Sequence, residues 1–268
     1  IAEPNYGLIT NIGRAHLGGF GSFEGVISTK AELYGFIEKG GDKVFYNQTN
    51  SIINDLIVRY HLEKRSVAYS SFCSSYDIIR EMGNPFLALK VKLDDETILV
   101  QSNLVGDYNA ENLLAAITVG RYFDVDITAI KNAIESYTPT NNRSQFLKTD
   151  KNTVIMDAYN ANPSSMDAAI RNFASLNSFN KKVIIGEMLE LGEYSEVEHK
   201  RIVELLVSLG FQDVFLVGDG FRSVHDKYLF FSNSDECMDY LKNHSISGCT
   251  ILLKGSRGVR LEKLMELL

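Results

Sequence analysis

The sequence lacks the features that are typical of secreted proteins, of proteins stabilised by a metal and of membrane proteins. Its three cysteines, Cys73, Cys237 and Cys249, are widely separated along the 268 residues. An odd number of widely separated cysteines argues against a disulfide framework or a zinc site. Such cysteine usage is typical of proteins in a reducing cytoplasm. No apolar run reaches the length of a membrane span, and the N-terminus lacks the basic start and apolar core of a signal peptide. We therefore expect a cytoplasmic protein without membrane insertion.

Positive charge is also in deficit. The net charge of −7 gives a nucleic-acid partner no electrostatic support. An anionic small-molecule substrate would need basic groups placed locally against this background. The complete phosphate loop, Gly-x-x-x-x-Gly-Lys-Ser/Thr, occurs nowhere in the sequence. The chain has no initiator methionine and opens almost directly into an expected strand, so we expect it to be a piece of a longer protein.

What is present begins with an apolar run, residues 8–12, which predicts a short strand. A glycine-rich loop that carries His16 follows this run. Ser22 stands where a helix N-cap belongs, and the apolar residues then recur at helical spacing over 23–38. The pattern predicts a strand, a loop and a helix in that order.

Lys30 lies on the apolar stripe of this predicted helix. Such a lysine can sit at the edge of the stripe and extend its amine to water. Alternatively, burial lowers its pKa and leaves a reactive neutral amine. A neutral amine can add carbon dioxide, and the resulting carbamate is an anionic oxygen ligand for a hard metal such as magnesium. His16 in the preceding loop could then share the same metal.

The rest of the chain shows two patterns. Residues 86–93 and 97–101 predict a hairpin around a turn at 94–96, and the polar segment 138–142 is the best candidate for a linker. Beyond it, short apolar strands alternate with amphipathic helices, which predicts an α/β fold with a mainly parallel, doubly wound sheet. The expected strands are 43–46, 67–69, 144–148, 153–157, 182–186, 214–217, 228–231 and 250–253; the other expected helices are 51–60, 109–122, 128–137, one capped by Asn162, 196–209, 234–243 and 259–267.

Three polar motifs could bind a ligand, and each has a purely structural alternative. Asn109 and Asn112 share a helix face and could pair with the edge of a base, or they simply form an N-terminal cap. Asp157 closes a strand and could bind ribose hydroxyls or the water shell of a metal, or it belongs to a polar turn. Lys254 and Arg257 follow another strand and suit a carboxylate or phosphate, or they form a solvated basic turn.

The acidic stretch 186–193 also follows a predicted strand, and His199 lies in the helix after it. Its spacing matches no set of metal ligands. We therefore expect packing and surface charge here rather than a metal site.

Taken in order, these motifs resemble the Mur ligase family of ATP-dependent amide ligases in peptidoglycan synthesis. The residues that carry the resemblance are 9–17, 30–32, 106–112, 157–166, 186–192 and 254–257. They are most similar to the member that joins D-alanyl-D-alanine to UDP-N-acetylmuramoyl-tripeptide. The resemblance implies the C-terminal part of a central ATPase domain at 1–139, followed by a Rossmann-like C-terminal domain at 140–268. A fragment without the phosphate loop is expected to be inactive alone and monomeric.

The resemblance also implies roles for single residues. Lys30 would be the carbamylated lysine, and it would ligate magnesium together with His16. Four further residues would contact ATP, and another five would lie near the substrates. The first set is Asn109, Asn112, Arg143 and Asp157; the second is Tyr159, Asn160, Asn162, Lys254 and Arg257.

Other functions remain open on the sequence. A non-catalytic nucleotide-binding module would use the Rossmann-like half, but it gives no reason for the spacing of His16 and Lys30. A stand-alone magnesium hydrolase would use those two residues, but few carboxylates lie near them in the sequence. Folylpolyglutamate synthase is the alternative within the same type of ligase.

Overall fold

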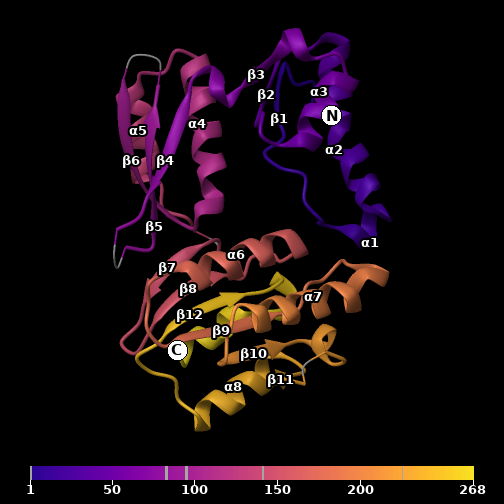
Figure 1. Ribbon diagram of the computed structural model, residues 1–268. Helices are drawn as coiled ribbons and strands as arrows, with labels where there is room; N and C mark the ends of the chain where they lie inside the picture. Colours follow the sequence, from indigo (N-terminus) through magenta and orange to yellow (C-terminus); the bar gives the residue numbers. More distant parts are fainter. Residues whose placement is uncertain (1, 82–83, 94–95, 141, 225) are drawn as a thin grey trace. The chain divides into compact units, whose positions relative to one another are not determined.

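The computed structural model describes residues 2–81, 84–93, 96–140, 142–224 and 226–268. It contains two compact units, each with its own sheets and core (Figure 1). The first unit comprises Ile1–Ile12, Ser22–Asn103 and Asp107–Tyr137, and the second comprises Gly13–Gly21, Leu104–Gly106 and Thr138–Leu268. The division into domains at 1–139 and 140–268 stays a prediction; Asn141 of the expected linker lies outside the described residues.

A small parallel sheet forms the start of the first unit. Its strands are β1 (Tyr6–Leu8), β2 (Lys43–Tyr46) and β3 (Ser66–Ala68), in the order β1-β2-β3. The helices α2 (Phe23–Gly40) and α3 (Ser51–Arg59) connect them in the β-α-β manner that parallel pairing requires. The predicted strand and helix pattern is therefore confirmed for this part of the chain.

The position of the first strand was predicted wrongly. The ladder pairs Tyr6 with Lys43 and Leu8 with Phe45, so β1 ends where the apolar run begins. Ile9 and Ile12 are nonetheless buried, each with 7% of its surface exposed. An apolar run indicates that its side chains are buried, but a loop can bury apolar side chains as well as a strand can.

The helix α2 begins and ends as its sequence predicts. The Ser22 side chain accepts a hydrogen bond from the backbone N–H of Gly25, which satisfies one of the free amides of the first turn. Val26, Tyr34 and Ile37 form its buried stripe. The helix stops at Gly40 and Gly41, two residues beyond the predicted end.

A second sheet of the first unit has the order β4-β5-β6. β5 (Phe86–Lys92) and β6 (Thr97–Val105) are the predicted hairpin strands, and Asp94 and Asp95 of the predicted turn lie outside the described residues. β4 (Ser75–Ile79) was not predicted. It pairs antiparallel with β5, and its mostly exposed side chains give no alternating apolar signal.

Two helices, α4 (Ala110–Tyr122) and α5 (Ile127–Ser136), complete this unit. The sequence placed the cap of the second helix at Thr128, but Asp126 caps it, because its carboxylate accepts from the amides of residues 128 and 129. Among the described residues, no helix is both long and apolar enough to cross a membrane.

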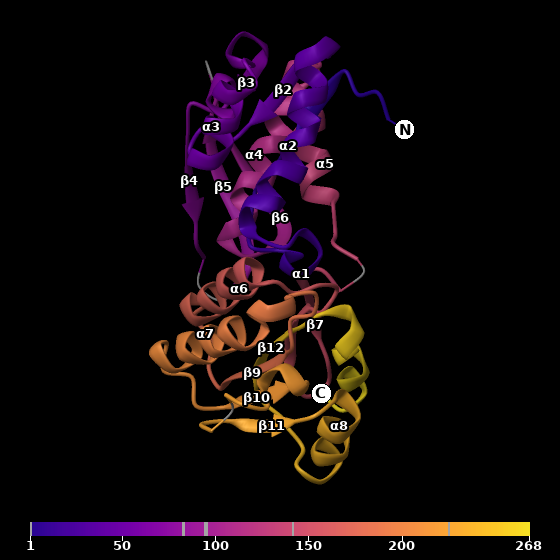
Figure 2. The ribbon, with the colours of Figure 1, turned by 90° about the vertical axis from the view of Figure 1, so that its right-hand side faces the viewer.

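The second unit is built on a six-stranded sheet of order β11-β10-β9-β12-β8-β7. All neighbouring pairs are parallel except β7 with β8, as the expected doubly wound pattern predicts. The strands are β7 (Gln145–Lys148), β8 (Thr153–Asp157), β9 (Lys181–Gly186), β10 (Val214–Val217), β11 (Leu229–Phe231) and β12 (Thr250–Lys254). Helices α6 (Pro163–Ser175) and α7 (Ser195–Ser208) cover one face, and α8 (Ser234–Asn243) covers the other (Figures 1 and 2).

The chain after β12 differs from its prediction. The pattern at 259–267 predicts an α-helix, but two short 3₁₀ turns lie there, η6 (Arg257–Val259) and η7 (Leu261–Glu266). Between them Arg260 has a left-handed backbone with φ of 58°, which interrupts a right-handed helix. Leu261 and Leu264 still join the apolar core beneath the sheet. The periodicity therefore located the buried face but not the type of helix.

Candidate functional site

The best-defined polar site of the second unit lies where β8 and β12 end. Asp157 and Lys254 are register partners on these adjacent parallel strands. The Lys254 Nζ lies 2.6 Å from Oδ2 of Asp157 and 3.5 Å from the carbonyl oxygen of Asn160. Only 1% of the Lys254 side chain is exposed. A buried ammonium is tolerated because the carboxylate beside it compensates its charge.

This end of the sheet is also a topological switch point. β12 lies between β8 and β9, but the chain leaves β8 and β9 toward α6 and α7 and leaves β12 toward the opposite face. Ligands of doubly wound sheets bind outside the carboxyl ends at such a point. Two glycines allow the ends of β9 and β12 to approach: a Cβ on Gly255 would lie 2.8 Å from the Cα of Gly186.

Two arginines and one tyrosine gather at the same edge. The guanidinium carbon of Arg143 lies 3.9 Å from the centroid of the Tyr159 ring, and that of Arg257 lies 5.8 Å from it. Both distances are within the range of a cation–π interaction. The structure therefore brings together three residues that the sequence places 16 and 98 positions apart (143 to 159 and 159 to 257).

The loop before β7 is fixed against the end of β8. The Tyr159 N–H donates to the carbonyl of Asn142 (3.2 Å), and the Ser144 N–H donates to Oδ1 of Asp157 (3.3 Å). Asn142 and Ser144 both have left-handed backbones, with φ of 58° and 47°. Such conformations persist only when surrounding contacts hold them. These bonds fix the backbone on both sides of Arg143.

Asn162 has a clear structural role. Its side chain accepts from the N–H of Ser165, whose hydroxyl accepts in turn from the N–H of Asn162. This reciprocal capping box, with Pro163 in the first turn, starts α6 as predicted. Its side-chain oxygen is thus already used within the helix cap.

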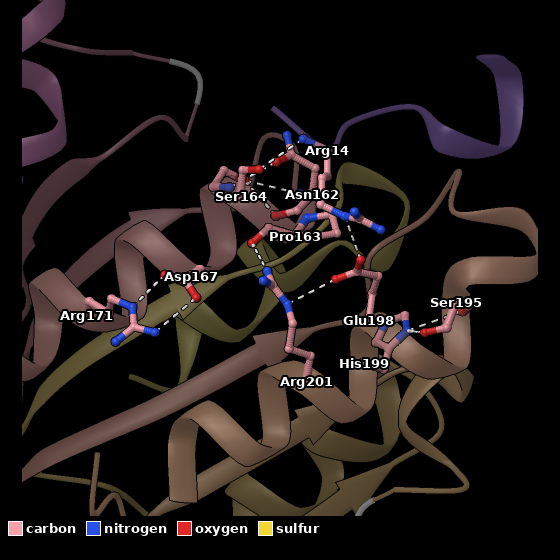
Figure 3. A network of polar contacts seen from close by, with 11 residues as sticks. Arg14, Asn162, Pro163, Ser164, Asp167, Arg171, Ser195, Glu198, His199 and Arg201 are labelled. Atoms are coloured by element: carbon pink, nitrogen blue, oxygen red, sulfur yellow. Dashed lines mark hydrogen bonds and ion pairs between the residues drawn. The ribbon is translucent and has the colours of Figure 1, made fainter. Parts of the chain in front are cut away.

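A buried carboxylate organises the neighbouring surface (Figure 3). Glu198 of α7 has 4% of its side chain exposed and pairs with two arginines, Arg14 Nε at 2.8 Å and Arg201 Nε at 3.1 Å. The backbone N–H of Arg14 also donates to the hydroxyl of Ser164 in α6 (3.0 Å). These contacts attach the segment Gly13–Gly21 to the two helices of the second unit.

His16 lies in that attached segment, where it precedes the short helix α1 (Leu17–Phe20). Its Nδ1 makes a close contact with a carboxylate oxygen of Glu190, and the Gly18 N–H donates to the Glu190 carbonyl (2.8 Å). Glu190 and Glu198 were not predicted as partners of this segment. No spacing could have indicated them, because they lie more than 170 positions away along the chain.

The acidic loop after β9 is organised by packing, as expected. His199 is fully buried, its Nε2 accepts from the N–H of Met188 (2.9 Å), and its Nδ1 lies 2.7 Å from the carbonyl of Ser195. Burial lowers the pKa of the His199 imidazole, and the Ser195 carbonyl and the charge of Glu198 only partly offset this. The imidazole is therefore a neutral structural group, with one nitrogen accepting and the other donating.

Lys30 belongs to the first unit and lies half-buried on α2. Its Nζ donates to the carbonyl of Asn11 in the loop after β1 (2.9 Å), so the amine points to the carboxyl end of the parallel sheet. Burial lowers the pKa of the Lys30 amine, the direction that carbamate formation requires. No group of three or more His, Cys, Asp or Glu in the described residues could hold a metal. A shared metal of His16 and Lys30 stays a prediction.

Asn109 and Asn112 lie together at the start of α4. The Asn112 side-chain N–H donates to Oδ1 of Asn109 at 3.0 Å, as their spacing on one face predicts. Asn109 is buried, with 8% of its surface exposed, whereas Asn112 is exposed. The pair presents amide groups in a fixed orientation, and its contact with a base stays a prediction.

Comparison with known families accounts for both units. Residues 1–120 match the Mur ligase middle domain, and residues 142–257 match the Mur ligase glutamate ligase domain, in the order found along the chain. The chain belongs to the Mur ligase family. The expected fold, part of a central Mur ligase domain followed by a Rossmann-like domain, is confirmed.

Among curated relatives, this Mur ligase chain is 30% identical to a UDP-N-acetylmuramoyl-tripeptide–D-alanyl-D-alanine ligase of Buchnera aphidicola subsp. Baizongia pistaciae. The alignment covers 99% of the chain and 59% of that relative. The chain therefore spans about three fifths of the length of the curated relatives that it matches over its whole extent.

Solved structures show the same Mur ligase fold. MurF from Acinetobacter baumannii superposes with a TM-score of 0.84 at 24% identity over 98% of this chain and 59% of that one. The MurF ligase from Thermotoga maritima, a structure in complex with ADP, gives a TM-score of 0.79 at 19% identity over 99% and 62%. At these identities the superpositions establish the fold.

Proposed function

We propose that this chain is the larger part of an ATP-dependent ligase that joins D-alanyl-D-alanine to UDP-N-acetylmuramoyl-tripeptide in the cytoplasm. The observation that carries the proposal is the match of 99% of the chain to a relative of that name at 30% identity. The polar edge of the second unit supports it, because a basic cluster there suits anionic substrates in a chain of net charge −7.

The proposed reaction has two steps. A carboxylate oxygen of the tripeptide attacks the γ-phosphorus of ATP, and ADP leaves to give an acyl phosphate. The amine of D-alanyl-D-alanine then attacks the acyl carbon, loses a proton and expels inorganic phosphate, which forms the amide. Phosphoryl transfer of this kind depends on positioning and on groups that neutralise negative charge.

The residues of this chain would divide these tasks. Asn109 and Asn112 are proposed to contact the adenine, since their paired amides offer both donors and acceptors. Arg143 and Asp157 are proposed to act at the nucleotide. The remaining candidates near the substrates are Tyr159, Asn160, Asn162, Lys254 and Arg257, among which the Asn162 side chain is engaged in the α6 cap.

Magnesium is the metal that such a reaction implies, and Lys30 fits it only after carbamylation. The free Lys30 amine is a donor to Asn11 and cannot ligate a cation while protonated. Its half-buried position and lowered pKa favour the neutral amine that accepts carbon dioxide. A carbamylated Lys30 and His16 would then hold magnesium, which when bound supplies charge neutralisation at the phosphates.

The test is an assay of amide formation in a full-length ligase that contains this chain. The enzyme is incubated with ATP, magnesium, UDP-N-acetylmuramoyl-tripeptide and D-alanyl-D-alanine, and the product is identified by mass spectrometry. Product is expected only when all four are present. Lys30→Met should abolish turnover because no carbamate can form, whereas Lys39→Met near the exposed end of the same helix should not.

Two results would contradict the proposal. The first is a complete, folded enzyme that forms no product from this pair of substrates. The second is ligation of a different pair of substrates, such as the amine of free glutamate to a carboxylate of a folate; that would assign the chain to a sister ligase.

A further inference from the structure

Backbone hydrogen bonds anchor three side chains at the edge of the second unit. Hydrogen bonds fix the backbone on both sides of Arg143. Tyr159 follows the end of β8 and is bound through its own N–H to the same loop. Beside Arg257, the buried Ser256 donates its N–H to the Glu187 carbonyl (3.2 Å) and accepts from the Leu189 N–H (2.9 Å). The backbone near each of the three residues is therefore held in place, and their side chains meet at the Tyr159 ring.

The two guanidinium groups form no ion pair with the residues that the structure describes. None of the salt bridges within the part of the chain that the structure describes includes Arg143 or Arg257. The carboxylate of Asp157 at this edge is already paired with Lys254 and accepts from the N–H of Ser144. Two cations against one aromatic ring repel each other, and a bound anion would relieve that repulsion.

We propose that Tyr159 is a positioning residue that holds Arg143 and Arg257 as one binding site for an oxyanion. An aromatic face attracts a guanidinium without neutralising it, whereas a carboxylate would occupy its donors. The donors at the edge of each guanidinium then remain available for two parallel hydrogen bonds to phosphate or carboxylate oxygens. The Tyr159 ring therefore fixes the positions of the two guanidinium groups, and the site keeps their positive charge.

The proposed ligand is an oxyanion, which can be either a phosphoryl group or a carboxylate. The use of this site in amide formation rests on the proposed function, but oxyanion binding itself does not. In the ligase, the phosphoryl groups of ATP and the terminal carboxylate of D-alanyl-D-alanine are the two sources of such an anion. Steady-state kinetics distinguish the two sources, because loss of the site raises KM only for the substrate that carries the bound anion.

The first experiment measures binding of inorganic phosphate and of acetate to the 268-residue chain by isothermal titration. Tyr159→Leu removes the ring and should weaken binding of the preferred anion about tenfold, since each cation–π contact contributes modestly. Tyr159→Phe keeps the ring and should bind as the unaltered chain does. Phe230→Leu is the matched control, because it removes a ring that lies 5.4 Å beneath another arginine, Arg222, elsewhere in the unit.

A spectroscopic measurement guards against a variant that fails to fold. The sequence contains no tryptophan, so Tyr159→Trp introduces a single indole at the site, whose emission can be excited apart from that of the tyrosines. Its indole keeps the aromatic face, and its emission should change when phosphate or acetate is added and saturate with the dissociation constant found by titration. Addition of chloride at equal ionic strength should leave the emission unchanged.

Three results would overturn the proposal. They are unaltered anion binding by folded Tyr159→Leu, an equal loss in Tyr159→Phe, and no binding of either anion by the unaltered chain. In the full-length ligase, Tyr159→Leu should raise KM for ATP or for D-alanyl-D-alanine more than it lowers kcat. A full-length ligase that binds oxyanions through Tyr159 but forms no amide would leave this site intact and refute only the proposed reaction.

Discussion

At the scale of single residues, the buried pair of Asp157 and Lys254 shows how a candidate site can also hold the fold together. The ammonium is 1% exposed and the carboxylate 16%, and their strands are adjacent in the sheet. Removing one partner of a buried pair leaves the other charge uncompensated, which costs more than the pair itself contributes. Substitutions here therefore affect stability as well as any chemistry.

Asp157→Asn is expected to lower the free energy of unfolding of the second unit by about 3–5 kcal/mol, because Lys254 loses its counter-charge. The measurement is urea denaturation followed by circular dichroism. Asp219→Asn is the matched control, since its pair with Arg222 is exposed on both sides, and it should change stability by no more than about 0.5 kcal/mol. Similar effects of the two substitutions would show that the buried pair is not required.

His199 predicts a pH dependence of stability. Burial holds the pKa of its imidazole below the ordinary value of 6.5, so the unfolded chain binds a proton more readily than the folded one. Stability from this residue is complete above pH 6.5 and falls as the pH drops from there toward the lowered pKa. The slope is at most about 1.4 kcal/mol per pH unit for one proton.

The measurement compares the original chain with His199→Gln at several pH values between 5 and 8, a range chosen around the ordinary histidine pKa. Glutamine can still accept from the Met188 N–H and donate to the Ser195 carbonyl, but it does not titrate. The two chains should lose stability at different rates only on the acid side. A constant difference across the range would mean that His199 is not the titrating group.

At the scale of elements, the sequence predicted two helix caps correctly and a third, Thr128, wrongly. Ser22 and Asn162 start α2 and α6 as the sequence indicates, because a cap depends on residues within one turn. The strand expected at residues 8–12 and the helix expected at 259–267 were wrong, although both segments are buried where the pattern requires. The spacing of apolar residues indicates which face of a segment is buried. Whether that segment forms a strand, an α-helix or a 3₁₀ turn depends on its pairing partner and its backbone angles.

The capping box of α6 gives a prediction at this scale. Asn162→Ala should destabilise the second unit by about 1 kcal/mol, because the amide of Ser165 loses its acceptor. Asn162→Asp keeps an acceptor oxygen and should retain most of the stability, as measured by thermal unfolding. If alanine and aspartate have equal effects on stability, the cap is not what Asn162 provides.

At the scale of the whole molecule, the chain comprises two units with separate cores. In the second unit, strand residues such as Leu252 and Ile184 have at most 2% of their surface exposed. In the first, Val44 and Ile53 are equally buried. Each unit thus buries apolar side chains of its own, which makes independent opening the expected behaviour.

Leu252→Ala should therefore accelerate hydrogen exchange in one unit only. The cavity is expected to cost about 2–5 kcal/mol, and amides of β8, β9 and β12 should exchange faster as a result. Peptides that cover β2 and α3 should keep their rates in the same mass-spectrometric measurement. Uniform acceleration along the chain would mean that the two units open together.

The sequence by itself determined the family and the order of most elements, and it nominated most of the residues at the candidate site. Motif order, caps and apolar periodicity are properties of neighbouring residues, so they can be recognised without coordinates. Only the tertiary structure decided which distant residues meet: Arg143 and Arg257 at Tyr159, and Glu198 between Arg14 and Arg201. These contacts depend on the strand order of the sheet and on the packing of α6 and α7, which no local spacing encodes.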